Sequence, residues 1–496
     1  MRRRRPLSRL VLAVALLASA GPLLAAQDLM QTWRAALARD PIYSAARAAY
    51  RAAQEVLPQT RAGLLPSATA NLGGIYHENR STHGMRRADS GRRGTWELVL
   101  EQPVFDWSAW QTYERAKVLV ADADVNLALA YQDLLLRTAQ AYFDVLAAQD
   151  TLSALEAEKA AVAEQLASAR RNFELGNATV TDIHEAQARY DLVVADELQA
   201  HNDLEVARDA LSRLIGEPPV ELARLPYDVA LPAPNPNRLE AWSAQAETSG
   251  LEVVRAQLAT RIAEYGIDIA RGGHYPTLSL TASSGSASDS AFEEARRGRP
   301  VDNRVGLQLS IPLYAGGGVS SRVTEAVERV QQARHEYENA RRQAIQQARR
   351  YFTGVNTGLA RIRALEAGEK SSRAAVAANR TGYEVGVRIN LDVLNAQQQL
   401  YATLRDLARA RYETVMAGLR LRATAGILSE VDLENINQLL REPGQGGPSP
   451  FTVPAPAGPE AAVAPAPAGA YTPPAAAPPS NARSRMEAPL RGLPGR

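Results

Sequence analysis

The feature that most restricts the fold of this chain is an internal repeat that spans most of its 496 residues. The segment AQAYF, which ends at Phe143, returns as ARRYF, which ends at Phe352. The segment FELGNATVTDIHEAQ begins at Phe173 and returns as YEVGVRINLDVLNAQ from Tyr383, so the two copies are offset by about 210 residues. Because a repeated pattern identifies the architectural unit, we expect two copies of one unit to fill the chain.

Each copy contains two short segments in which apolar and polar residues alternate, the pattern of a strand with two different faces. These segments lie around Ala68–Leu72 and Trp96–Leu100 in the first copy, and around Leu278–Ala282 and Val305–Ile311 in the second. The sequence therefore predicts four strands, joined in pairs by polar loops of about 20 residues. Strands with one apolar face and long loops at one end are typical of outer-membrane barrels. A soluble antiparallel sheet with one wet face is the alternative.

Long helical segments, rich in Ala, Leu, Gln, Glu and Arg, lie between the strand pairs. Residues 108–173 include no proline or glycine. At about 1.5 Å per residue, these 66 positions would form a rod of about 100 Å. A second helix is expected to return along it at 181–215, and the other copy repeats the plan at 319–383 and 391–427. Each copy is therefore predicted to contain one long helical hairpin.

The N-terminal segment indicates an exported protein. Arg2–Arg5, the apolar run Leu10–Leu17 and the small residues before Gln27 are the three parts of a secretory signal peptide, predicted to span 1–26. The chain has no cysteine, which excludes disulfides, a thiolate metal site and a lipoprotein anchor. At the other end, the Pro, Ala and Gly tail 442–496 has too little apolar surface to offset its ordering entropy, so we expect it to be disordered.

The charge balance gives no reason to expect a nucleic-acid partner. Loss of five arginines with the signal peptide would leave 51 basic and 54 acidic residues, a net charge of −3 in place of the formal +2. The six histidines lack metal-ligand spacing, and no carboxylate accompanies a nucleophile or a cofactor motif. We therefore predict no metal, no cofactor and no enzyme activity. A basic loop cluster is interpreted as solvated, with contact to lipopolysaccharide phosphates as the alternative: Arg86, Arg87, Arg92 and Arg93.

Four strands per chain are too few to close a membrane barrel. In lipid every backbone polar group needs a partner, so a membrane sheet must close on itself, and single-chain barrels have at least about eight strands. Outside the signal peptide no stretch approaches the roughly 20 apolar residues of a membrane-spanning helix, so any membrane span must consist of strands. Several chains must then share one barrel. Three chains would contribute twelve strands, although these arguments do not choose between two, three and four subunits.

A resemblance to a known family becomes specific at TGYEVGVRINLDVLNAQQQLYATLRDLARARYETVMAGLRLRATAGILSEVDL. This segment is similar to the TolC family of outer-membrane export channels, and the similarity runs from LMQTWRAALARDP to about Leu440. The resemblance implies an α+β membrane protein, a homotrimer in which four strands per chain form a shared 12-stranded outer-membrane barrel. A long α-helical periplasmic barrel continues from it, girdled by an equatorial domain.

The function implied by the resemblance is a passive, gated conduit for multidrug efflux or type I protein secretion. It would lie in the outer membrane of a Gram-negative cell, in contact with outer-membrane lipid, and extend into the periplasm. The implied partners are a periplasmic adaptor (membrane fusion) protein and an inner-membrane transporter of the ABC, RND or MFS type. A secreted structural coiled-coil protein of the envelope, without a pore, is the alternative, but such a spacer has no use for four alternating strands.

The resemblance divides the chain into segments that follow the repeat. Residues 27–216 form the first structural repeat and 243–427 the second. Residues 217–242 are expected to be an equatorial-domain linker, and 428–441 a further equatorial segment. The signal peptide precedes these segments and the tail follows them.

The resemblance also implies a gate at the two helix turns, around Gly176 and Gly386, where glycine permits the backbone to reverse. The same turns would dock the adaptor. The family narrows its entrance with rings of acidic side chains, and Asp392 matches the first ring. The second ring, Asp in the best-known members, is Asn395 here, so we expect weaker cation selectivity and weaker block by multivalent cations.

The resemblance also implies a latch between neighbouring helix pairs at these turns. Carried over by position, Tyr383 and Arg388 on the second turn face Thr181 and Asp182 on the first. Arg388 with Asp182 would be the main ionic tether, and Tyr383 with Asp182 a hydrogen bond. Partly exposed pairs contribute only about 1 kcal/mol each, which suits a latch that adaptor contacts release. Ordinary solvated turn charges are the alternative.

Overall fold

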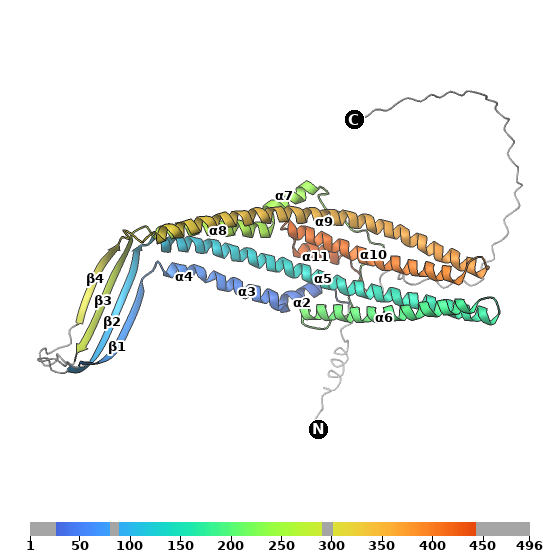
Figure 1. Cartoon of the computed structure of the whole chain (residues 1–496), viewed down its shortest axis with the longest axis horizontal. Helices are drawn as coiled ribbons and strands as arrows, with labels where there is room; N and C mark the ends of the chain where they lie inside the picture. The colour runs from blue at the N-terminus through green and yellow to red at the C-terminus, as the bar shows by residue number, and fades with distance from the viewer. Residues whose placement is uncertain (1–25, 80–88, 290–300, 443–496) are drawn as a thin grey trace, which may run out of the picture. The chain divides into compact units, whose positions relative to one another are not determined.

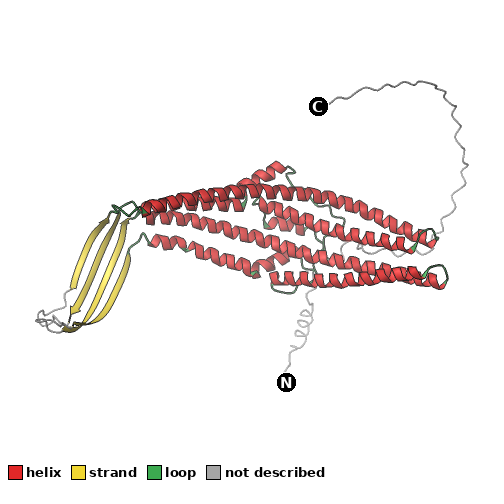
Figure 2. Ribbon diagram, in the orientation of Figure 1, coloured by secondary structure: helices red, strands yellow, loops and turns green. Residues whose placement is uncertain are grey.

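The computed structural model describes residues 26–79, 89–289 and 301–442, which form long helices and one group of strands (Figure 2). The predicted signal peptide up to residue 25, the predicted tail after residue 442 and the loop residues 80–88 and 290–300 lie outside these ranges, and with them Arg86 and Arg87 of the basic loop cluster. Within these three ranges, no helix combines the length and the apolar character that crossing a membrane requires.

Four antiparallel strands form one sheet in the order β1, β2, β3, β4 (Figure 1). They are β1 (Ser67–Asn79), β2 (Asp89–Phe105), β3 (Thr277–Asp289) and β4 (Val301–Ser310), so the four predicted strands are confirmed. The predicted loops of about 20 residues were too long, because the strands continue into both of them and Arg92 and Arg93 lie in β2. Strand β2 of the first repeat pairs with β3 of the second. The sheet therefore joins the two repeats and ends in two edge strands, β1 and β4, each with one side unpaired among the described residues.

The strand register places the predicted apolar positions on one face of the sheet, since directly opposed residues point to the same side. Leu100 lies opposite Ala68 on β1 and Ala282 on β3, and Ala282 lies opposite Val305 on β4. Large side chains on this face are exposed in the protomer, including Val305 at 78% and Leu307 at 68%. An exposed apolar surface of this kind marks contact with a membrane or with another protein.

Two long helical hairpins follow the strand pairs, as predicted. Helix α5 (Trp107–Glu174) returns as α6 (Val180–Ile215), and α9 (Gly318–Glu384) returns as α10 (Asn390–Thr424). Helix α5 contacts α6, α9 contacts α10, and α10 also contacts α5 (Figure 1). The largest difference from the prediction is the end of α10, expected at residue 427, because Gly426 takes a left-handed φ of 74° that ends the helix.

Shorter helices flank the hairpins, and the repeat did not predict them. Helix α8 packs against α5 and α9, while α3 and α4 pack against α5. Helix α2 contacts α5, α6 and α11. The bounds of these helices are α2 Leu29–Arg39, α3 Pro41–Gln54, α4 Val56–Ala62, α8 Leu251–Gly272 and α11 Glu430–Asn437.

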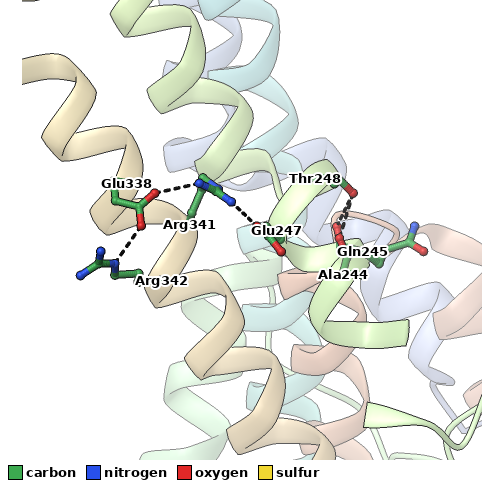
Figure 3. Close-up of polar contacts among 7 residues, drawn as sticks. All are labelled: Ala244, Gln245, Glu247, Thr248, Glu338, Arg341 and Arg342. Atoms are coloured by element: carbon green, nitrogen blue, oxygen red, sulfur yellow. Dashed lines mark hydrogen bonds and ion pairs between the residues drawn. The ribbon is translucent and has the colours of Figure 1, made fainter. Parts of the chain in front are cut away.

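Helix α7 (Leu239–Ser249) begins inside the predicted equatorial linker and is bound to α9 by an ion-pair network (Figure 3). Arg341 on α9 donates to Glu247 on α7 and, at 2.8 Å, to Glu338 on its own helix. Glu338 also accepts a 2.9 Å hydrogen bond from Arg342. These contacts attach α7 to the second hairpin.

The largest apolar core joins the N-terminal helix, both hairpins and the C-terminal segment. Phe143 on α5 is 1% exposed, and its ring stacks on Tyr412 of α10 at 5.6 Å. The Tyr412 hydroxyl donates a 2.7 Å hydrogen bond to Asp150. Burial raises the pKa of the Asp150 carboxyl, and the hydrogen bond from Tyr412 opposes that shift. Beside this core, isolated backbone bridges join the predicted equatorial segments to each other and to the N-terminus: Gln27 to Leu222 and Arg224 to Arg441.

Candidate gate at the helix tips

The two hairpins reverse through turns with the same backbone geometry. Gly176 and Gly386 both have a φ of 77°, in the left-handed region that side chains with a Cβ disfavour. The residue after each glycine donates its N–H to a carbonyl five residues earlier, at 2.7 Å from Asn177 to Asn172 and at 2.8 Å from Val387 to Gly382. The chain thus turns at both predicted glycines.

The side chains that follow the turns differ. At the first turn Thr179 caps α6, because its hydroxyl accepts the N–H of Asp182 at 3.3 Å. The Asp182 carboxylate in return accepts the Thr179 N–H and hydroxyl, both at 2.8 Å. At the second turn Ile389 holds the equivalent position with φ −93° and ψ 160°, against −93° and 159° for Thr179, and has no side-chain cap. One turn therefore satisfies its helix terminus with side chains and the other does not.

The second turn carries the predicted entrance residues. The guanidinium of Arg388 lies 3.6 Å from the carboxylate of Asp392, and both groups are partly exposed. Asn395 is exposed three residues further along α10. In the described part of one protomer, Arg388 forms its ion pair with Asp392 and none with Asp182. Asp392, the carboxylate proposed for the first entrance ring, is thus already paired with Arg388 of the same turn.

Tyr383, the other predicted latch residue, bonds to a different partner within the protomer. Its hydroxyl accepts a 3.1 Å hydrogen bond from the side-chain amide of Asn172, which links α9 to α5. Thr181 is exposed, and the Asp182 carboxylate is engaged by the cap. The predicted contacts of Tyr383 and Arg388 with Asp182 are not formed inside the described protomer. They stay predictions for neighbouring helix pairs of an assembled channel.

Asn390 is a site residue that the sequence reasoning missed. It is fully buried, and its side-chain amide donates to the Asp182 carbonyl at 3.1 Å. Its side-chain oxygen accepts a 2.6 Å hydrogen bond from Gln165 on α5. One side chain therefore joins α10 to both helices of the first hairpin. A difference between the two repeats could have indicated it, since the apolar Val180 occupies the equivalent position in the first copy.

Large apolar side chains are exposed at both turns. Their exposed fractions range from 45% to 79%. They are Phe173, Leu175 and Val180 at the first turn and Val385, Val387 and Ile389 at the second. Exposed apolar clusters on an otherwise polar surface mark interaction sites. The tips thus combine hydrogen bonds between the hairpins with an exposed apolar surface that is suited to a protein partner.

The chain is similar to known proteins along both repeats. The family model described as outer membrane efflux protein matches residues 33–217 and 242–427. The outer membrane protein TolC of Vibrio cholerae is 33% identical over 423 residues, 84% of this chain and 94% of that protein. The alkaline protease secretion protein AprF of Pseudomonas aeruginosa is 32% identical over 422 residues, 82% and 86% of the two chains. The crystal structure of the outer membrane protein VceC from Vibrio cholerae shares the fold, with a TM-score of 0.69, 20% identity and coverage of 80% and 96%.

Proposed function

The chain belongs to the outer membrane efflux protein family, and from that premise we propose how this export channel is assembled and gated. It is an outer-membrane channel for efflux and type I secretion that extends into the periplasm. The observation that carries this function is the match to family members along both repeats, with four strands and two long hairpins in the same chain. Its relatives are channel proteins, and we infer that the chain has no catalytic activity.

The assembly that we propose is a homotrimer, as the family resemblance implies, and the sheet is compatible with it. The sheet of one protomer has two open edges, β1 and β4, and an exposed apolar face that includes Leu307. Three protomers joined edge to edge would close the sheet and turn that face toward outer-membrane lipid. The opposite face, which carries Gln308 and Ser310, would then line the lumen.

The gate that we propose lies at the helix tips. Asp182, Tyr383 and Arg388 would hold neighbouring helix pairs together, with Thr181 beside them, and the ring of Asp392 and Asn395 would set the ion preference of the entrance. The apolar surfaces around Gly176 and Gly386 would dock a periplasmic adaptor. Through the adaptor, an inner-membrane transporter of the ABC, RND or MFS type would supply the energy for export.

Complementation tests the export function directly. We expect expression in a Gram-negative cell that lacks its own channel of this family to restore dye efflux and growth in the presence of the exported drug. Leu307→Arg should prevent assembly in the outer membrane, because an arginine on the lipid face costs about 2–4 kcal/mol at mid-membrane. The matched variant Gln308→Arg, on the opposite face, should assemble.

Two outcomes would contradict the proposal. If Leu307→Arg assembled as well as Gln308→Arg, the apolar face would not be the lipid-facing one. If assembled protein in the outer membrane gave no efflux with any adaptor and transporter pair, the channel function itself would fail, and a structural role in the envelope would be the better account.

A further inference from the structure

We propose that the buried carboxylate of Glu158 is the pivot about which the helix tips open. It fixes the second hairpin to the first at one level of α5, so that only the part of each hairpin between that level and its glycine turn moves. This inference rests on the proposed function, because it concerns how the proposed gate opens. We call Glu158, Arg189 and Arg405 the Glu158 clamp.

The Glu158 clamp joins three helices through one carboxylate. Glu158 lies on α5 and is 2% exposed. One of its oxygens accepts a 2.8 Å hydrogen bond from Arg189 on α6, and the other accepts a 3.0 Å hydrogen bond from Arg405 on α10. Removal of either arginine would leave one oxygen of a buried carboxylate without its charged partner, which is unfavourable. The contact between the two hairpins is therefore hard to break at this level.

On the tip side of the clamp, the contacts between the hairpins are weaker. Among the described residues they include the amide bonds of Asn390, the bond from Asn172 to Tyr383 and an ion pair between Arg380 and Glu164. The carboxylate of Glu164 is 58% exposed, and exposed pairs of this kind contribute little to stability. The buried apolar cluster on this side is small, with Val162, Leu166, Ala186 and Leu394.

On the strand side of the clamp, the same helices are held by a larger core. Tyr412 on α10 stacks on Phe143 and donates to the buried Asp150. Next to it, Arg411 is 4% exposed and donates to the carbonyl of Pro226 at 3.0 Å, which ties α10 to the equatorial segment. Packed cores of this kind resist gradual deformation. Movement of α10 against α5 is therefore easiest beyond Glu158, over a length of about 24 Å to the end of α5.

Two bridged cysteine pairs test where the moving part begins. The chain has no cysteine of its own, so the cross-linker would react only with the engineered thiols. The tip pair is Asn172→Cys with Tyr383→Cys. The strand-side pair is Gln140→Cys with Arg420→Cys, whose native side chains lie 2.9 Å apart. The same bis-maleimide would link α5 to the second hairpin in either pair.

Single-channel conductance is measured in trimers opened by Arg388→Ala, before and after cross-linking. We expect the tip bridge to return the conductance to its closed value and the strand-side bridge to leave it unchanged. A strand-side bridge that closes the channel as fully as the tip bridge would overturn the inference, because the motion would then extend past Glu158.

The role of the carboxylate is tested by Glu158→Gln beside the matched variant Glu197→Gln. Glu197 binds Lys159 within the first hairpin, so its loss does not touch the contact between hairpins. In Glu158→Gln the strand-side bridge should now reduce the conductance, since the motion is no longer stopped at the clamp. In Glu197→Gln that bridge should still have no effect.

Identical behaviour of the two variants would overturn the pivot while leaving the channel function intact. Where Glu158→Gln does not assemble, Arg405→Gln removes the α10 side of the clamp alone and is measured in the same way. Silence of every variant and of the unmodified chain, despite confirmed insertion, would overturn the proposed function and the pivot with it.

Discussion

The two helix tips share one backbone and differ in their side chains. Gly176 and Gly386 have the same φ, and the residues that begin the returning helices have nearly the same φ and ψ. The first tip uses Thr179 and Asp182 to cap its own helix, whereas the second places Ile389 at the cap. The two copies thus share the geometry of the turn, while only the first uses side chains to cap the helix that follows.

The largest effect that we expect at the helix tips tests whether the turns are equivalent. Gly176→Ala and Gly386→Ala should each destabilise their tip by about 1–2 kcal/mol, because an alanine must adopt the left-handed conformation. A Cβ at either position would meet nothing within 4 Å, so backbone strain alone sets the effect. Hydrogen exchange of the tip amides measures it. Clearly unequal losses of stability would contradict the equivalence of the two turns, since equal backbone conformations should be equally strained by alanine.

An exchange of caps tests the difference between the tips. Ile389→Thr should stabilise the second tip by about 1 kcal/mol, because it recreates with Asp392 the spacing that Thr179 has with Asp182. Thr179→Ala should cost the first tip about as much. Hydrogen exchange at the start of α6 and α10 is the measurement for both. If Ile389→Thr changed nothing, the missing cap would not be what distinguishes the second tip.

The smallest effect on stability concerns the entrance ring. Asn395→Asp adds one carboxylate per protomer at an exposed position, where substitutions change stability by less than about 0.5 kcal/mol. It should nevertheless raise cation preference and strengthen block by multivalent cations, since the negative potential at the entrance increases. Asn395→Gln is the neutral control. If block by multivalent cations were unchanged in Asn395→Asp, Asn395 would not line the entrance.

The parts of the fold that could be predicted are those with a strong local period. Alternation identified the strands, a long stretch without glycine or proline identified the first hairpin, and the repeat predicted the second. The contacts of Gln27, Leu222 and Arg441 join segments far apart in the chain, and no local pattern encodes them. The sequence likewise did not predict the buried ion pairs of Glu158. On a helix rich in carboxylates, only the packing of α6 and α10 distinguishes a buried clamp from a solvated charge.

The repeat predicted the positions of the turns, and the resemblance predicted latch contacts between neighbouring helix pairs, which stay predictions. The glycine turns lie where the repeat placed them, whereas the latch partners inside a protomer are Asn172 for Tyr383 and Asp392 for Arg388. Such pairings depend on rotamers and on neighbouring chains, which sequence alignment does not determine. Asn390 was visible as a mismatch between the copies, but its burial was not.

The central claim, a gated channel with its constriction at the helix tips, is tested most directly by single-channel conductance. Asp182→Ala removes the proposed latch and the carboxylate that accepts the Thr179 N–H, while Thr179→Ala removes the hydroxyl that caps α6 and leaves the carboxylate in place. The unmodified channel should give small, cation-preferring steps that grow markedly in Asp182→Ala and little in Thr179→Ala. Equal conductance of all three proteins, or silence from all three despite confirmed insertion, would contradict the claim.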